Sequence, residues 1–178
     1  MLLRLSTSSR LTRHRGSEMA HKTELDAVDR KIVRQLATDG RASYQAIADE
    51  VGLSRPAVME RVKRLEEAGY ITGYGARVDR AKSGFPVTAF VAVRYANSDY
   101  VGDEPRMRDM EKHPEVLECH HVAGEDCYML KVAAHDLESL QGVLRDLRGS
   151  SKTQMSTRTT IVLGTVFEKP GFVPVEPD

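Results

Sequence analysis

Residues 25–74 read LDAVDRKIVRQLATDGRASYQAIADEVGLSRPAVMERVKRLEEAGYITGY, and this stretch decides the fold of the first half of the chain. It contains three short amphipathic patterns separated by turn signals. The second and third patterns are joined by VGLS at 51–54, a tight turn with a glycine followed by a helix-capping serine. Two helices joined in this way are typical of a helix-turn-helix, whose second helix enters the major groove of DNA.

Apolar residues at helical spacing predict the three helices and the sides that they bury. Ser43 and Ser54 stand where the second and third helices need N-caps. Pro56 falls in the first turn of the third helix, where its missing N–H costs nothing, and Gly69 supplies a left-handed stop. The predicted core residues are Leu25, Val28, Ile32, Val33 and Leu36 in the first helix, Tyr44, Ile47, Ala48 and Val51 in the second, and Val58, Val62 and Leu65 in the third.

After the third helix, residues 71–78 read ITGYGARV and predict two short strands about a glycine-rich turn. This is the wing of a winged helix. The third helix itself is predicted to turn a polar side outward, with Arg61 near the boundary of that side. Its outward residues are Arg55, Met59, Glu60, Lys63 and Arg64.

The second half of the chain predicts the order βαββαβ. Strands are expected at 87–95, 116–122, 128–134 and about 153–167, and the turn AGED at 123–126 joins the middle two. Helices are expected at 105–112, with Asp103 as a candidate cap, and at Leu137, Leu140, Leu144 and Leu147, capped by Asp136. This is the ferredoxin-like split motif, an antiparallel sheet with two helices on one face. With the helices of the first half, this makes an α+β protein overall. The other face of the sheet needs a cover, so we expect a homodimer.

These motifs resemble the Lrp/AsnC (feast/famine) family of prokaryotic transcription regulators. The resemblance is carried in the first half by the motifs LDxxDxxIVxxL and IADEVGLSRPAVMERVKRLEEAGYITGY. It continues in the second half through VLECHHVAGEDCYMLKV and TRTTIVLGTVFE, so that it covers roughly residues 25–168. The resemblance implies a winged helix-turn-helix at 22–80 and an effector-sensing, oligomerising domain at 81–168, followed by a tail at 169–178. It also implies dimers that assemble into tetramers or octamers, and an amino acid or related metabolite bound between subunits. No cofactor is expected.

DNA contacts are expected at the front and outer side of the third helix, where Arg55 is the best candidate to read guanine. Arg61, Lys63 and Arg64, together with Arg77 on the wing, are expected to contact phosphates. The alternative for Lys63 and Arg64 is a solvated surface paired with Glu66 or Glu67. Glu60 repels phosphate but can accept a hydrogen bond from cytosine. The full predicted DNA-binding set is Ser43, Ser54, Arg55, Pro56, Met59, Glu60, Arg61, Lys63, Arg64 and Arg77.

An effector is expected near the turn at 123–126, as the resemblance implies. Turn amides bind a carboxylate, and acidic side chains pair with an ammonium group. The candidate effector residues are Gly124, Glu125, Asp126, Tyr128, Thr157 and Thr159. The alternative is that Gly-Glu-Asp is ordinary hairpin chemistry and that the threonines reflect β-preference alone.

Charge is divided unevenly along a chain of zero net charge. Residues 1–82 carry sixteen basic against eleven acidic groups and residues 83–178 carry ten against fifteen, net charges of +5 and −5. The front half is therefore the one that meets phosphate. Two cysteines fit a reducing cytoplasm, where a nucleoid-associated regulator belongs, and no apolar run approaches the roughly 20 residues of a membrane span.

Three other interpretations stay open. Residues 1–21 are a leader outside the fold. Its first eighteen residues, MLLRLSTSSRLTRHRGSE, are either a basic arm, a transit peptide or the product of an upstream start codon, with Met19 as the true start.

The second half of the chain contains side chains of the types that bind zinc, at His113, Cys119, His120, His121 and Cys127. Their spacing matches no zinc template, and strand alternation separates them. We expect no metal and no catalytic residue. The alternatives to a regulator are an architectural DNA-binding protein and a sirohaem decarboxylase-like enzyme, in which His120, His121 or Arg158 line a tetrapyrrole cavity.

Overall fold

The computed structural model describes residues 25–96, 100–149, 155–169 and 172. These residues form two compact units, 25–74 and 75–169. The leader, the predicted start of the last strand at Thr153 and most of the tail lie outside the described residues. Within the described part of the chain, no helix is long and apolar enough to cross a membrane.

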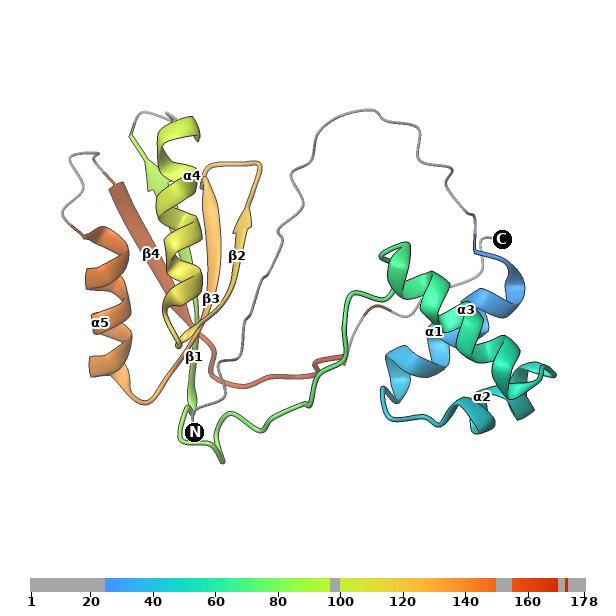
Figure 1. The fold of residues 1–178 in the computed structure, drawn as a ribbon. Helices are drawn as coiled ribbons and strands as arrows, with labels where there is room; N and C mark the ends of the chain where they lie inside the picture. Colours follow the sequence, from blue (N-terminus) through green and yellow to red (C-terminus); the bar gives the residue numbers. More distant parts are fainter. Residues whose placement is uncertain (1–24, 97–99, 150–154, 170–171, 173–178) are drawn as a thin grey trace, which may run out of the picture. The chain divides into compact units, whose positions relative to one another are not determined.

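The first unit consists of the three predicted helices, α1 (Ala27–Thr38), α2 (Tyr44–Val51) and α3 (Arg55–Glu67), coloured blue to green in Figure 1. Both predicted serine caps are confirmed, because Ser43 Oγ and Ser54 Oγ accept hydrogen bonds from backbone amides three residues later. Gly52 and Gly69 have φ of +72° and +76°, the left-handed conformation that the turn and the helix stop require.

The core of this unit is the one that the apolar spacing predicts. Ile32, Ile47 and Val58 are fully enclosed, one from each helix. All twelve predicted core residues are either buried or packed against the buried cluster. The polar side of α3 therefore points away from this core, as the helical period requires.

The wing prediction is wrong in one respect, because residues 71–78 contain no strand. Tyr74 instead donates a hydrogen bond from its hydroxyl to Glu66 of α3 at 2.8 Å, and Val78 is exposed. Two strands of three or four residues have only each other to pair with, and so short an isolated hairpin is marginal in water. The described first unit is a helix-turn-helix without a formed wing.

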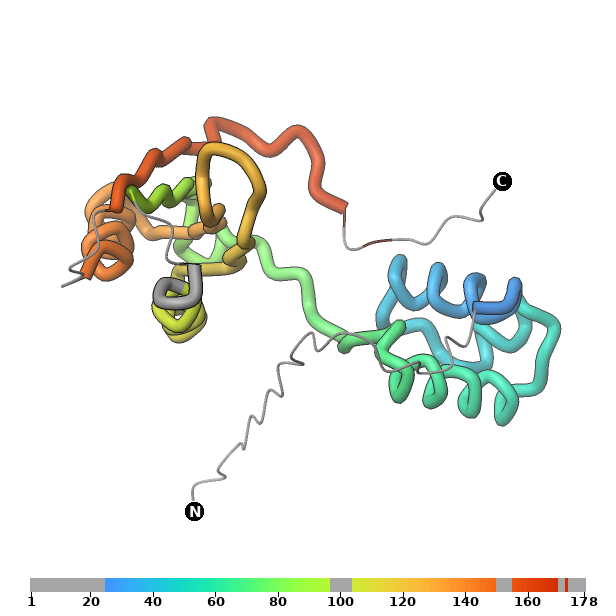
Figure 2. The backbone as a smooth tube through the Cα atoms, turned by 90° about the horizontal axis from the view of Figure 1, so that it is seen from above, coloured from blue at the N-terminus to red at the C-terminus, as the bar shows by residue number. Residues whose placement is uncertain are grey.

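The second unit is the predicted ferredoxin-like sandwich. Its strands are β1 (Val87–Tyr95), β2 (Val116–His121), β3 (Tyr128–Ala134) and β4 (Met155–Ile161), in the sheet order β2-β3-β1-β4. Every neighbouring pair is antiparallel. Its helices are α4 (Tyr100–Asp109), continued by a short 3-10 turn η1 (Met110–Lys112), and α5 (Leu137–Arg148). Figures 1 and 2 show α4 and α5 on the same face of the sheet.

The two faces of this sheet differ because strand residues alternate. Ala89, Val91 and Val93 of β1 are buried in the core formed with Leu130 of β3 and Leu140 of α5. The opposite face carries no helix, and we call it the open face. The register of the strands places on it Phe90, Ala92 and Arg94 of β1, Glu118 and His120 of β2, Met129, Lys131 and Ala133 of β3, and Ser156, Arg158 and Thr160 of β4.

The boundaries of α4 and β4 differ from the predictions. Helix α4 begins at Tyr100, so Asp103 lies inside it and is not its N-cap, and Pro105 lies in its interior. Strand β4 ends at Ile161, which pairs with Ala89 of β1, and one further backbone hydrogen bond joins the Val162 amide to the Thr88 carbonyl.

In α5 the predicted cap is confirmed, since Asp136 accepts from the Ser139 amide at 2.8 Å. Leu137 was predicted to face the core but is exposed. The buried residues of this helix are Leu140, Val143 and Leu147, whose spacing of three and four residues makes the stripe.

Candidate nucleic-acid interface and effector site

The exposed side of α3 carries the side chains that the sequence predicted to face outward. Arg55, Met59 and Lys63 are exposed and recur every four residues, so they share one side of the helix. Glu60 is exposed beside them. Lys63 lies 3.7 Å from Glu67, but both side chains are largely in solvent, where such a pair contributes little. The ammonium group of Lys63 therefore remains available to an anion.

A shallow groove lies where the front ends of α2 and α3 meet. It is lined by Ser43, Tyr44 and Arg55, together with Ala42 and Gln45. Ser43 and Ser54 cap the two helices, whose first amides carry partial positive charge. A guanidinium and a helix N-terminus on one groove favour an anion such as a phosphate.

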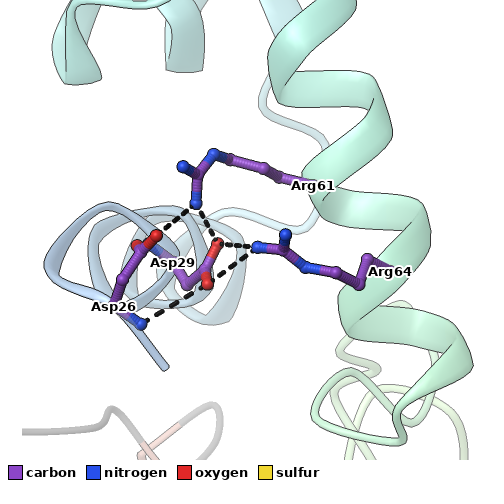
Figure 3. Close-up of polar contacts among 4 residues, drawn as sticks. All are labelled: Asp26, Asp29, Arg61 and Arg64. Carbon is purple, nitrogen blue, oxygen red and sulfur yellow. Dashed lines mark hydrogen bonds and ion pairs between the residues drawn. The ribbon is translucent and has the colours of Figure 1, made fainter. Parts of the chain in front are cut away.

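Two other arginines of α3 are engaged within the protein (Figure 3). Arg61 Nη1 donates to Asp26 at 2.6 Å and to Asp29 at 2.7 Å. Arg64 Nη2 lies 3.0 Å from both carboxylate oxygens of Asp29. We call these four residues the α1–α3 ion cluster. Both arginines are predicted from the sequence to contact phosphates, and in the structure their guanidinium groups bond to Asp26 and Asp29.

Asp26 has a second role in this cluster, since its carboxylate caps α1 by accepting from the Asp29 amide at 2.6 Å. Burial opposes ionisation of Asp26, but the Arg61 and amide hydrogen bonds outweigh it and hold the pKa of Asp26 below its usual value. The same bond to Asp26, followed by that to Asp29, raises the pKa of Arg61. Both groups are therefore charged near neutral pH.

Arg77, predicted to contact phosphate from the wing, belongs to the second unit. Its Nη2 donates to the backbone carbonyl of Glu168 at 3.2 Å. The Glu168 carboxylate also pairs with Lys131 at 2.8 Å and Arg80 at 3.2 Å. Glu168 thus ties the segment after β4 to the segment before β1. Glu168 is not among the site residues predicted from the sequence.

The turn between β2 and β3 holds the candidate effector residues. Glu125 is exposed, and Asp126 forms an ion pair with Arg158 of β4 at 2.8 Å. Gly124 has φ +143°, and a Cβ built on it meets nothing within 4 Å, so space lies in front of this turn. Arg158, which is ion-paired with this turn, is not among the predicted effector residues. Its signal in the sequence is a lone arginine between the two threonines.

The predicted threonines lie on the other face of the sheet from Arg158, since adjacent strand residues point to opposite sides. Thr157 Oγ1 accepts from Arg148 of α5 at 2.9 Å. Tyr128 is buried on the helix side, with its ring edge-on to Tyr95. The structure therefore joins Asp126 to Arg158 and places Thr157, Thr159 and Tyr128 toward the helices.

In β2, His120 lies on one face of the sheet and Cys119 and His121 lie on the other, as strand alternation predicts. His120 lies 3.2 Å from Glu118 on the open face, whereas the His121 ring lies 5.2 Å from that of Tyr128. Burial raises the pKa of Cys119, which keeps it a thiol. Among the described residues no three potential ligands gather as a metal site would require.

These features define a class of protein, a helix-turn-helix DNA-binding protein with a ferredoxin-like companion domain. Family models match both parts of the chain, an AsnC-type helix-turn-helix domain at residues 25–66 and an Lrp/AsnC ligand-binding domain at residues 88–172. The chain belongs to the Lrp/AsnC family of transcriptional regulators.

Individual relatives agree with this assignment. The chain is 37% identical over 150 residues to the transcriptional regulator LrpA of Mycobacterium tuberculosis, covering 84% of this chain and 97% of LrpA. It is 32% identical to the regulator LrpC of Bacillus subtilis, covering 83% and 98%. A solved feast or famine regulatory protein of M. tuberculosis, complexed with L-methionine, matches with a TM-score of 0.75 and 37% identity, covering 84% of this chain and 99% of that one.

Proposed function

We propose that this regulator reads operator DNA with the front half of α3. The observation that carries the proposal is the exposed side of α3, where Arg55, Met59 and Lys63 share one surface beside the capped groove. Arg55 is the guanine reader, because a guanidinium fits the two acceptors of guanine in the major groove. Glu60 accepts from cytosine. Lys63, Ser43 and the amides at the start of α2 position the protein on phosphates.

Three predicted contacts are left out of this proposal. Arg61 and Arg64 are bonded to α1, and Arg77 is bonded to Glu168 in the second unit. Ser54 and Pro56 stay in the proposed interface as the residues that set the start of α3 at the groove. The location proposed for the protein is the cytoplasm, at the nucleoid, since its ligand is DNA.

The second unit, we propose, forms a homodimer through its open face. Phe90 is 40% exposed there, and the short side chains of Ala92 and Ala133 lie on the same face. A second copy of the chain covers such a face without any additional segment of polypeptide. A two-fold dimer presents two copies of α3 to two half-sites about one or more helical turns (~34 Å) apart. Assembly into tetramers or octamers belongs to the same proposal.

An amino acid or related metabolite is the proposed effector, bound at the turn 123–126. A zwitterion needs both signs of charge, and the Asp126–Arg158 pair supplies them, with Glu125 exposed to solvent beside it. A solved relative holds L-methionine, which supports this ligand class. The effector regulates DNA binding only if it favours one assembly or half-site spacing over another.

Gly124→Val is expected to abolish the response to the effector and leave DNA binding in its absence unchanged. Valine is strained at φ +143°, and its side chain fills the space in front of the turn. Operator affinity measured with and without each amino acid checks this. As a control, Gly142→Val alters a half-buried glycine of α5, where an added Cβ also meets nothing within 4 Å. An unchanged response in Gly124→Val moves the pocket elsewhere.

The test of the whole proposal is a salt-dependent DNA titration of the full chain. The duplex upstream of its own gene is compared with a scrambled duplex of equal length. Tighter binding to the first, weakening linearly on a logarithmic salt scale, is the expected result. Equal binding to both duplexes supports the architectural alternative instead. The enzyme alternative gains nothing from the comparisons, in which the relatives described above are transcriptional regulators.

A further inference from the structure

Asp29 is the one charged residue buried among the described residues, with its side chain 3% exposed. A buried carboxylate costs several kcal/mol unless it is paired and hydrogen-bonded. Here Arg61, Arg64 and the Asp26 amide all donate to it. Its arginine partners stand on α3, more than 30 residues later in the chain. The carboxylate therefore joins the first helix directly to the candidate recognition helix.

The α1–α3 ion cluster is electrically balanced. Two carboxylates, Asp26 and Asp29, face two guanidinium groups, Arg61 and Arg64 (Figure 3). A phosphate approaching this side of α3 meets no net positive charge, unlike the exposed ammonium of Lys63. Removing either arginine should then delete no phosphate contact, whereas removing Lys63 should delete one.

The cluster also restrains rotation of α3 about its own axis. Val58, Val62 and Leu65 are buried on one side of the helix. Arg61 and Arg64 are three residues apart, so they lie on one stripe, and Lys63 between them does not share it. Apolar contacts tolerate sliding, whereas paired guanidinium and carboxylate groups fix an orientation through directed hydrogen bonds. The reading side of α3 is held at a fixed angle to α1.

We propose that Asp29 is a positioning residue for DNA reading, which fixes the orientation of α3 and withholds Arg61 and Arg64 from phosphate. The inference rests on the proposed role of α3. It has two consequences of opposite sign. Without the Asp29 charge, discrimination between sequences falls because α3 is no longer held. Attraction to any DNA rises because two arginines are released.

The decisive comparison is Arg64→Gln against Lys63→Gln in the full chain, since each variant removes one positive charge from the same helix. Binding to a scrambled duplex is measured over a range of salt concentrations. Lys63→Gln is expected to reduce the slope of log K against log salt by about 0.9 for each phosphate that Lys63 neutralises. Arg64→Gln is expected to leave the slope unchanged. Equal reductions in both variants overturn the inference.

Asp29→Asn supplies the second readout. Its salt slope on scrambled DNA is expected to steepen, by up to about 0.9 for each arginine released. Its preference for an operator over the scrambled duplex is expected to fall about tenfold, which is the discrimination that one bidentate base-reading pair provides. A purely structural role predicts weaker binding with no steepening, and that result overturns the inference. Circular dichroism checks folding, and if Asp29→Asn does not fold, the comparison of Arg64→Gln with Lys63→Gln decides.

The wild-type chain separates this inference from the proposed function. If the wild type does not bind DNA, the proposed function fails and takes the inference with it. If the wild type discriminates an operator and the slope falls as much for Arg64→Gln as for Lys63→Gln, only the positioning role fails. The two failures are distinguished in one set of titrations.

Discussion

Arg55→Ala is expected to weaken binding to the operator by about 1–3 kcal/mol, roughly five- to 150-fold, and to change binding to a scrambled duplex far less. Arg55 is exposed at the first residue of α3, beside the groove formed with Ser43. No carboxylate is paired with it in the described part of the chain, so its five donors are free for a base. The measurement is a parallel titration of both duplexes at one salt concentration.

Lys63→Ala is the matched control for Arg55→Ala. It removes a positive charge from the same exposed side of α3, and it is expected to weaken both duplexes alike because phosphates carry no sequence information. The ratio of the two affinities should therefore fall for Arg55→Ala and hold for Lys63→Ala. Equal losses on both duplexes for Arg55→Ala contradict its assignment as a base reader.

Phe90→Glu is expected to give a monomer and to lower operator affinity by about a hundredfold or more. Phe90 lies on the open face opposite Lys131 and Thr160 of the neighbouring strands. Lys131 is already paired with Glu118 and Glu168, so a further carboxylate buried between two packed sheets is not neutralised, and association becomes unfavourable. A monomer occupies one half-site and forfeits the gain from linking two binding events, on the order of 10²–10⁴.

Sedimentation measures the state of assembly for Phe90→Glu, and the DNA titration measures its consequence. Leu137→Glu is the control, because Leu137 is also an exposed apolar residue but lies at the start of α5, on the helix side of the sheet. This variant should remain a dimer with operator affinity intact. A Phe90→Glu protein that still sediments as a dimer shows that the interface lies elsewhere.

Local patterns predicted the first unit almost completely. Ser43, Ser54 and Gly69 act within one turn of their own positions, and apolar spacing alone assigned the core of all three helices. Asp29 escaped this reasoning because its partners are more than 30 residues away and periodicity records only apolar positions. The sequence did contain one signal, since Asp26 and Asp29 have the three-residue spacing of a capping box at the start of α1.

The wing and the effector site show a different limit. The glycines of residues 71–78 permit a turn, but strands form only where a partner strand exists, and the described residues supply none there. In β4 the hydroxyl groups of Thr157 and Thr159 suggested effector contacts, but these residues lie on the helix-covered face of the sheet. Arg158 lies on the opposite face, where it pairs with Asp126. Which residues of a strand share a face with a distant turn depends on the pairing register, and a single sequence does not specify that register.

The most direct test of the account is selection of bound sequences from a pool of random duplexes by the full-length protein. A dimer that reads DNA with two copies of α3 should enrich a pseudo-palindrome, with half-sites separated by about one helical turn or a multiple of it and with guanine at a fixed position in each half. Enrichment of a single unpaired half-site would contradict the dimeric arrangement. No enrichment, with DNA still bound, would contradict sequence reading by α3 altogether.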